Sequence, residues 1–76
     1  MSPDRFHVVM TFETGGPAIE GTWESGPAAA GKFQSFVGSH GSIDGVEIVL
    51  WSETAGERER LRTWTKERQL EIHQAA

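Results

Sequence analysis

The 76-residue chain contains no cysteine, so neither a disulfide bond nor a thiolate metal site can support its fold. No apolar run approaches the roughly 20 residues of a membrane span, and no charged-then-apolar leader opens the sequence. The composition therefore predicts a single small domain, residues 1–76, in a reducing, cytoplasmic compartment.

Basic residues are also scarce, with seven Lys and Arg against eleven Asp and Glu and a net charge of −4. An acidic chain disfavours non-specific nucleic-acid binding, because that binding grows with the number of phosphates neutralised. Residues 58–76 nevertheless hold five of the seven basic side chains. This basic stripe keeps a weaker nucleic-acid interaction open, although it is also typical of a solvated edge strand whose charges discourage aggregation.

Residues 5–24 alternate between apolar and polar side chains on both sides of a Thr14–Pro17 turn, which predicts an antiparallel hairpin. Pairing Glu13 with Ala18 sets His7 opposite Glu24 on the exposed side. The buried side of this predicted hairpin comprises Val8, Met10, Phe12, Ile19, Gly21 and Trp23.

Residues 26–40 change to a 3–4 spacing of apolar side chains, which predicts a helix with one apolar stripe. Ser25 or Gly26 is the expected N-cap, with Pro27 in the first turn. Gly41 is the expected left-handed cap at the other end. The stripe comprises Ala29, Ala30, Phe33, Phe36, Val37 and His40.

Residues 46–65 predict a second hairpin, and its loop length decides which side chains face inward. A two-residue Ala55-Gly56 loop, or a four-residue loop, sets Leu50 opposite Leu61 and keeps the arginines outside. An odd, bulged loop would bury Arg60 and Arg62 unpaired, at a cost of several kcal/mol. The even loop is therefore the prediction, and it turns the two tryptophans of this hairpin, Trp51 and Trp64, away from the core.

The predicted fold is α+β: a two-layer ββαββ sandwich with a four-stranded antiparallel sheet and one packed helix. Residues 66–76 are compatible with a short helix, a continued strand or a tail. The dipeptide Thr22-Trp23 recurs as Thr63-Trp64. If that repeat is structural, the two hairpins are related by a pseudo-twofold axis, and an extra residue in the second turns its tryptophan outward.

No motif in the chain amounts to an enzyme signature, a metal site or a cofactor site. Residues 26–32 match the phosphate-loop spacing, but Phe33 stands where the Ser or Thr that holds magnesium belongs. His7, His40 and His73 show no metal-ligand spacing. Ser39, His40 and Asp44 have the residue types for acyl transfer but no defined pocket. An enzyme using His40 or His7 would require a pocket with a second polar group.

The face of the sheet opposite the helix is the predicted interaction surface, because an apolar cluster ringed by charge usually marks a partner site. We expect self-association or docking of another protein there, since Trp and Arg dominate such contacts. Two alternatives remain. The C-terminal segment covers this face, or the tryptophans of this face stack on the bases of single-stranded nucleic acid. The predicted binding residues are Val9, Val49, Trp51, Arg60, Arg62 and Trp64.

Overall fold

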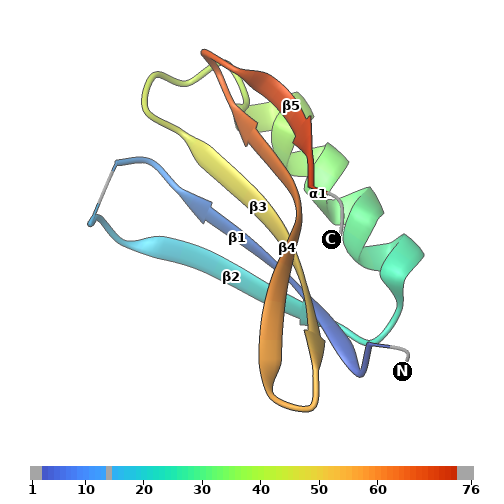
Figure 1. The fold of residues 1–76 in the computed structure, drawn as a ribbon. Coiled ribbons are helices and arrows are strands. Elements are labelled where there is room, and N and C mark those ends of the chain that lie inside the picture. The colour runs from blue at the N-terminus through green and yellow to red at the C-terminus, as the bar shows by residue number, and fades with distance from the viewer. Residues whose placement is uncertain (1–2, 14, 74–76) are drawn as a thin grey trace.

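One helix packs on a five-stranded antiparallel sheet in the computed structural model, which describes residues 3–13 and 15–73 (Figure 1). The elements are β1 (Arg5–Thr11), β2 (Ala18–Trp23), α1 (Gly26–His40), β3 (Glu47–Thr54), β4 (Glu57–Thr65) and β5 (Gln69–Ile72). The strand order across the sheet is β2-β1-β3-β4-β5. The predicted α+β sandwich is confirmed, with five strands in place of four.

The fifth strand comes from the segment whose sequence left a short helix, a strand or a tail open. β5 pairs antiparallel with β4, and Leu70 and Ile72 lie opposite Trp64 and Arg62. Helix-forming composition is a weak prior that tertiary pairing overrides. The β4–β5 turn is closed by Gln69 Nε2, which donates to the Lys66 carbonyl at 2.9 Å. Residues 74–76 of this segment, and Thr14 of the first predicted turn, lie outside the described residues.

The first hairpin has the predicted faces but a different register. Thr11, not Glu13, lies opposite Ala18, so the ladder is displaced by two residues. Val8 consequently faces Gly21, and the Trp23 ring lies over that glycine, where an added Cβ would contact the ring. A two-residue displacement preserves every side chain's face, so the pattern alone could not distinguish the two registers.

Helix α1 has Ser25 as its N-cap, whose side chain accepts from the Ala28 N–H at 3.3 Å. Within residues 3–13 and 15–73, no helix has the length and apolar character that crossing a membrane requires. α1 packs mainly on β1, β3 and β2. The core between the two layers comprises Val8, Met10, Ala29, Phe33, Val46, Ile48 and Leu50.

The β3–β4 hairpin begins as predicted and then departs from its register. Thr54 pairs with Glu57 across the Ala55-Gly56 turn, and Trp51 lies opposite Arg60. Both turn residues have positive φ, 52° and 84°, as a two-residue hairpin loop with the right-handed twist requires. The register then shifts between Leu50 and Trp51.

This bulge leaves Leu61 as the extra residue of β4 and overturns the predicted facing of the strand's second half. Leu50 lies opposite Arg62 and Ile48 opposite Trp64, so Arg62 and Trp64 face the helix. The sequence argument assumed one register along the whole strand, whereas one extra residue reverses it midway. The free-energy cost of desolvating the Arg62 guanidinium is also smaller than the sequence argument assumed, because Arg62 is only half-buried.

Trp64 fixes the end of the helix through Gly41. Its Nε1–H donates to the Gly41 carbonyl at 2.9 Å. Gly41 has φ −65°, which is right-handed, so the predicted left-handed cap is wrong. Glycine is needed here for space: a Cβ on Gly41 would clash with the Val37 carbonyl oxygen and would lie 2.7 Å from Trp64 Nε1.

Gly41→Ala should therefore destabilise the protein by about 1–3 kcal/mol, because the Val37 carbonyl and the Trp64 ring must both move to admit the methyl group. Gly38→Ala is the matched control: it lies within α1, and an added Cβ meets nothing within 4 Å. That change should stabilise the protein by about 0.5–1 kcal/mol. Urea unfolding followed by circular dichroism measures both, and equal effects of the two substitutions would contradict the packing of Trp64 on Gly41.

Candidate functional site

The structure distributes the six predicted binding residues over both faces of the sheet. Trp51 and Arg60 remain on the face away from α1, termed the open face, which also holds the valine pair Val9 and Val49. Trp64 and Arg62 lie on the face that α1 covers, termed the helix face. The predicted contact surface therefore does not exist as one cluster.

The open face is built around a buried histidine that sequence reasoning placed in solvent. His7 is 3% exposed and lies opposite Thr22, not Glu24. Its Nε2 lies 2.7 Å from Glu53 Oε1, and its Nδ1 lies 3.0 Å from Thr22 Oγ1. Because an ionised carboxylate only accepts hydrogen bonds, Nε2 is the protonated nitrogen.

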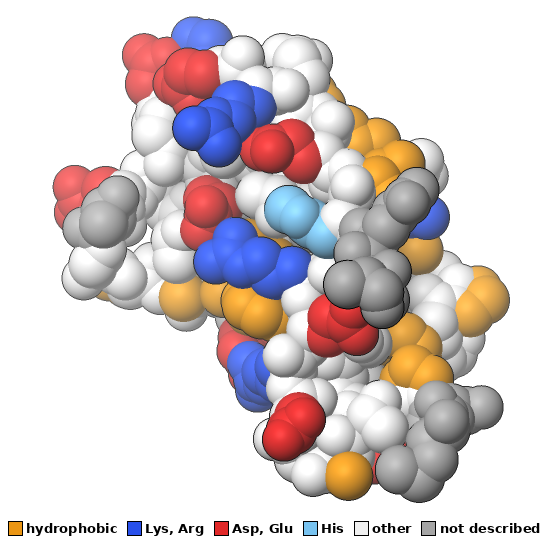
Figure 2. Space-filling view, viewed as in Figure 1, with side chains coloured by type: hydrophobic (Ala, Val, Ile, Leu, Met, Phe, Trp, Pro, Cys, Tyr) orange, Lys and Arg blue, Asp and Glu red, His pale blue; other side chains and the backbone are white. Residues whose placement is uncertain are grey.

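Charged side chains close this polar network toward solvent. Arg58 Nη1 lies 3.3 Å from Glu20 Oε1, and Arg58 Nε lies 3.8 Å from Glu53 Oε1. Figure 2 shows acidic and basic side chains interleaved over this part of the surface, with hydrophobic side chains only in small groups between them. Among the described residues, every buried side-chain nitrogen and oxygen has a hydrogen-bond partner.

Trp51 and Arg60 engage each other on the open face. The Arg60 guanidinium carbon lies 4.9 Å from the centre of the Trp51 ring, which is a cation–π contact. Val49, in turn, is only 3% exposed. The open face consequently offers a partner little apolar area, and one side of its indole ring is already covered.

The exposed large hydrophobic side chains of the described residues lie elsewhere. They are Phe12, Ile19, Ile43, Leu70 and Ile72, with exposed fractions of 37%, 50%, 39%, 48% and 64%. Ile43 belongs to the connection after α1, and the others follow the helix face by register. Because α1 packs on β1, β3 and β2, the helix face stays open mainly along its β4–β5 side.

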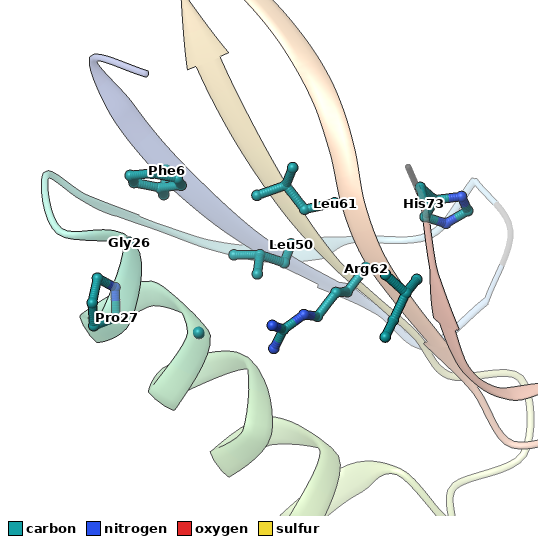
Figure 3. Close-up of a pocket in the computed structure, with 9 residues that line it drawn as sticks. Phe6, Gly26, Pro27, Leu50, Leu61, Arg62 and His73 are labelled. Atoms are coloured by element: carbon teal, nitrogen blue, oxygen red, sulfur yellow. The ribbon is translucent and has the colours of Figure 1, made fainter. Parts of the chain in front are cut away.

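The β5 side of this face forms a groove of about 470 Å³ against the first turns of α1. Figure 3 shows the Arg62 side chain extending beside Leu50 toward α1, with Pro27 on the opposite wall, and Ile72 also lines the groove. Sequence reasoning missed this groove because the fifth strand and the bulge both contribute to it. The alternation of Leu70 and Ile72 was the available signal.

The residue types for acyl transfer do not assemble into a catalytic set. Ser39 Oγ lies 2.6 Å from His40 Nδ1 on the exposed side of α1. Asp44 instead pairs with Lys66, with Oδ1 and Nζ 2.5 Å apart. That hydrogen bond and charge pair lower the pKa of Asp44 and raise the pKa of Lys66. In the part of the chain that the structure describes, no three His, Asp or Glu side chains are grouped to hold a metal ion.

Glu53→Ala should cost about 1–3 kcal/mol of stability, because it leaves the buried Nε2–H of His7 without an acceptor. Glu24→Ala is the matched control, since Glu24 is exposed and lies where the sequence placed the partner of His7. Its effect should stay within about 0.5 kcal/mol. Chemical denaturation compares the two, and a larger loss from Glu24→Ala would contradict the observed network.

Comparison of the chain with protein-family models, with curated proteins and with solved structures finds no match in any of the three. The geometry of the described residues is therefore the basis for the proposals that follow.

Proposed function

We propose that this protein is a non-enzymatic interaction module that associates with a second copy of itself through strand β5. The observation that carries the proposal is the edge position of β5 combined with its exposed apolar side chains. The proposal keeps the expected self-association and moves its surface from the open face to this edge.

The backbone of β5 supports edge pairing. The His73 N–H donates to the Leu61 carbonyl at 2.9 Å, so His73 directs its backbone groups toward β4. Backbone groups alternate in direction along an antiparallel strand. The N–H and C=O groups of Leu70 and Ile72 therefore point away from β4, where a second strand can pair with them.

The side chains of the same residues supply the apolar contact. Leu70 is 48% and Ile72 64% exposed, and complete burial of such a side chain contributes about 1.5–3 kcal/mol. The opposite edge, β2, exposes one large hydrophobic side chain, Ile19, and follows Pro17. Edge pairing through β5 buries more apolar surface than edge pairing through β2.

Charge selects between the two two-fold registers that place Leu70 of one copy opposite Leu70 or Ile72 of the other. Pairing Leu70 with Ile72 of the second copy would set Glu71 opposite Glu71 of the second copy, and two like charges directly opposite each other are destabilising. Pairing Leu70 with Leu70 of the second copy sets Glu71 opposite Gln69. We favour the second register, which joins two sheets into one ten-stranded sheet.

The histidines support a non-enzymatic role. Both ring nitrogens of His7 have partners within the fold, and His73 Nε2 lies 2.9 Å from Thr63 Oγ1. The nucleic-acid alternative gains no support, because the arginine and tryptophan left on the open face contact each other. We also propose a cytoplasmic location, because a chain without cysteine forms no disulfide bond and needs no oxidising compartment.

Sedimentation equilibrium from about 1 to 300 µM should show a monomer–dimer equilibrium, and Leu70→Thr should weaken it about tenfold or more, because each dimer loses two apolar side chains from the interface. Ile19→Thr is the matched control, since Ile19 is exposed to a similar extent, 50%, on the other edge strand. It should leave the equilibrium unchanged.

A third variant tests the backbone. Ile72→Pro removes an N–H that points away from β4, at a position where an edge strand tolerates proline and where the preceding residue, Glu71, lies within the strand, so it should abolish dimerisation while circular dichroism stays unchanged. A wild-type monomer at 300 µM, or a dimer weakened by Ile19→Thr and not by Leu70→Thr, would contradict the proposal.

A further inference from the structure

The groove between α1 and the β4–β5 hairpin has walls that are almost wholly apolar. Pro27 and Ala30 of the first helical turns form one wall, and Leu61 and Ile72 form the other. Leu50 and Phe6 line it from the central strands. Its volume, about 470 Å³, lies within the range of about 300–1,000 Å³ typical of small-molecule sites.

Two of the residues that line this groove are ionisable, Arg62 and His73. Of these, Arg62 carries the permanent charge. Its side chain extends into the space between the strands and α1 (Figure 3). It is half-buried, and within residues 3–13 and 15–73 it has no ion pair or cation–π contact. A guanidinium held among apolar groups without a counter-charge is unfavourable.

The other basic side chains are in a different situation. Those that contact carboxylates are Arg58, Lys66 and Arg68, and those that lie over aromatic rings are Lys32 and Arg60. Arg5 also lacks such a contact in the described residues, but it is exposed to water. Among residues 3–13 and 15–73, Arg62 is therefore the basic side chain that combines partial burial with the lack of a counter-charge.

The charge of the groove is opposite to that of the whole chain. The net charge of the protein is −4, yet the groove lining contains no Asp or Glu, and the first turn of α1 contains no acidic residue. A guanidinium presents paired N–H donors that match the two oxygens of a carboxylate. The groove thus combines one anion-binding group with an apolar channel.

We propose that this groove binds a small organic monocarboxylate with an apolar body, its carboxylate on Arg62 and its body between Pro27, Ala30 and Ile72. The groove opens on the helix face, but it shares Ile72 with the outer edge of β5 that we propose to pair with a second copy. Binding would supply a counter-charge that Arg62 does not have among the described residues, and it would cover the apolar walls.

The test uses three probes on the full chain: decanoate below its micellar concentration, decanol as the uncharged analogue, and acetate as the charge without the body. Titrations followed by two-dimensional NMR should give saturable shifts for decanoate at Ala30, Leu61 and Ile72. Decanol should bind at least tenfold more weakly, and acetate should give no saturable shift.

Arg62→Met should weaken decanoate binding at least tenfold, because it keeps the length and apolar character of the side chain and removes the charge. The matched control is Arg60→Met, two residues away on the same strand and on the open face, which should bind decanoate like the wild type. Circular dichroism confirms that both variants are folded.

Several results would overturn the proposal. Equal binding of decanol and decanoate, unchanged affinity in Arg62→Met, or shifts confined to the open face would each do so. The Leu70→Thr variant separates this site from self-association, because Leu70 does not line the groove. It should bind decanoate normally even if no dimer exists, whereas binding that disappears with the dimer would show that a second copy forms the site.

Discussion

A single extra residue in strand β4 determines how this protein presents its surface. The β3–β4 ladder changes register between Leu50 and Trp51, so the two halves of β4 face in opposite senses. Near the turn, Arg60 lies over Trp51 on the open face. Beyond the bulge, Trp64 packs toward the helix and donates to the Gly41 carbonyl.

The bulge also decides which charged and apolar side chains lie on each face of the sheet. On the open face, His7 has partners for both ring nitrogens, and Arg58 joins the two nearby glutamates. On the helix face, α1 packs on β1, β3 and β2, which leaves Arg62 in an apolar groove and Ile72 largely in solvent. A partner or ligand therefore gains more from the helix face than from the open face, the reverse of what the sequence indicated.

The sequence predicts the element types well, because periodicity reports directly which side chains are buried. The helix lies where the 3–4 spacing predicts it, and the two-residue Ala55-Gly56 turn is present. The two-residue displacement of the first hairpin could not be read from alternation, since a pattern with period two is unchanged by a shift of two. The bulge was missed because one register was assumed along the whole of β4. The buried His7 was missed for a different reason: its partner Glu53 belongs to a strand 46 residues away.

One available signal pointed the right way. The Thr-Trp dipeptide occurs at the same place in both hairpins, and the structure puts both tryptophans on the helix face, Trp23 opposite Phe6 and Trp64 opposite Ile48. The repeat therefore indicates the correct side of the sheet for Trp64. The argument from the cost of burying unpaired arginines placed Trp64 on the wrong side. That argument treated Arg60 and Arg62 as one pair, but the bulge places them on opposite faces.

The register of the β3–β4 hairpin is the claim on which the groove site depends, and cross-strand NOEs between backbone protons measure it most directly. The account predicts that Trp51 lies opposite Arg60, whereas Leu50 lies opposite Arg62 and Ile48 opposite Trp64. An uninterrupted ladder with Leu50 opposite Leu61 and Ile48 opposite Thr63 would contradict it. Arg62 and Trp64 would then return to the open face, and the groove would lose its guanidinium.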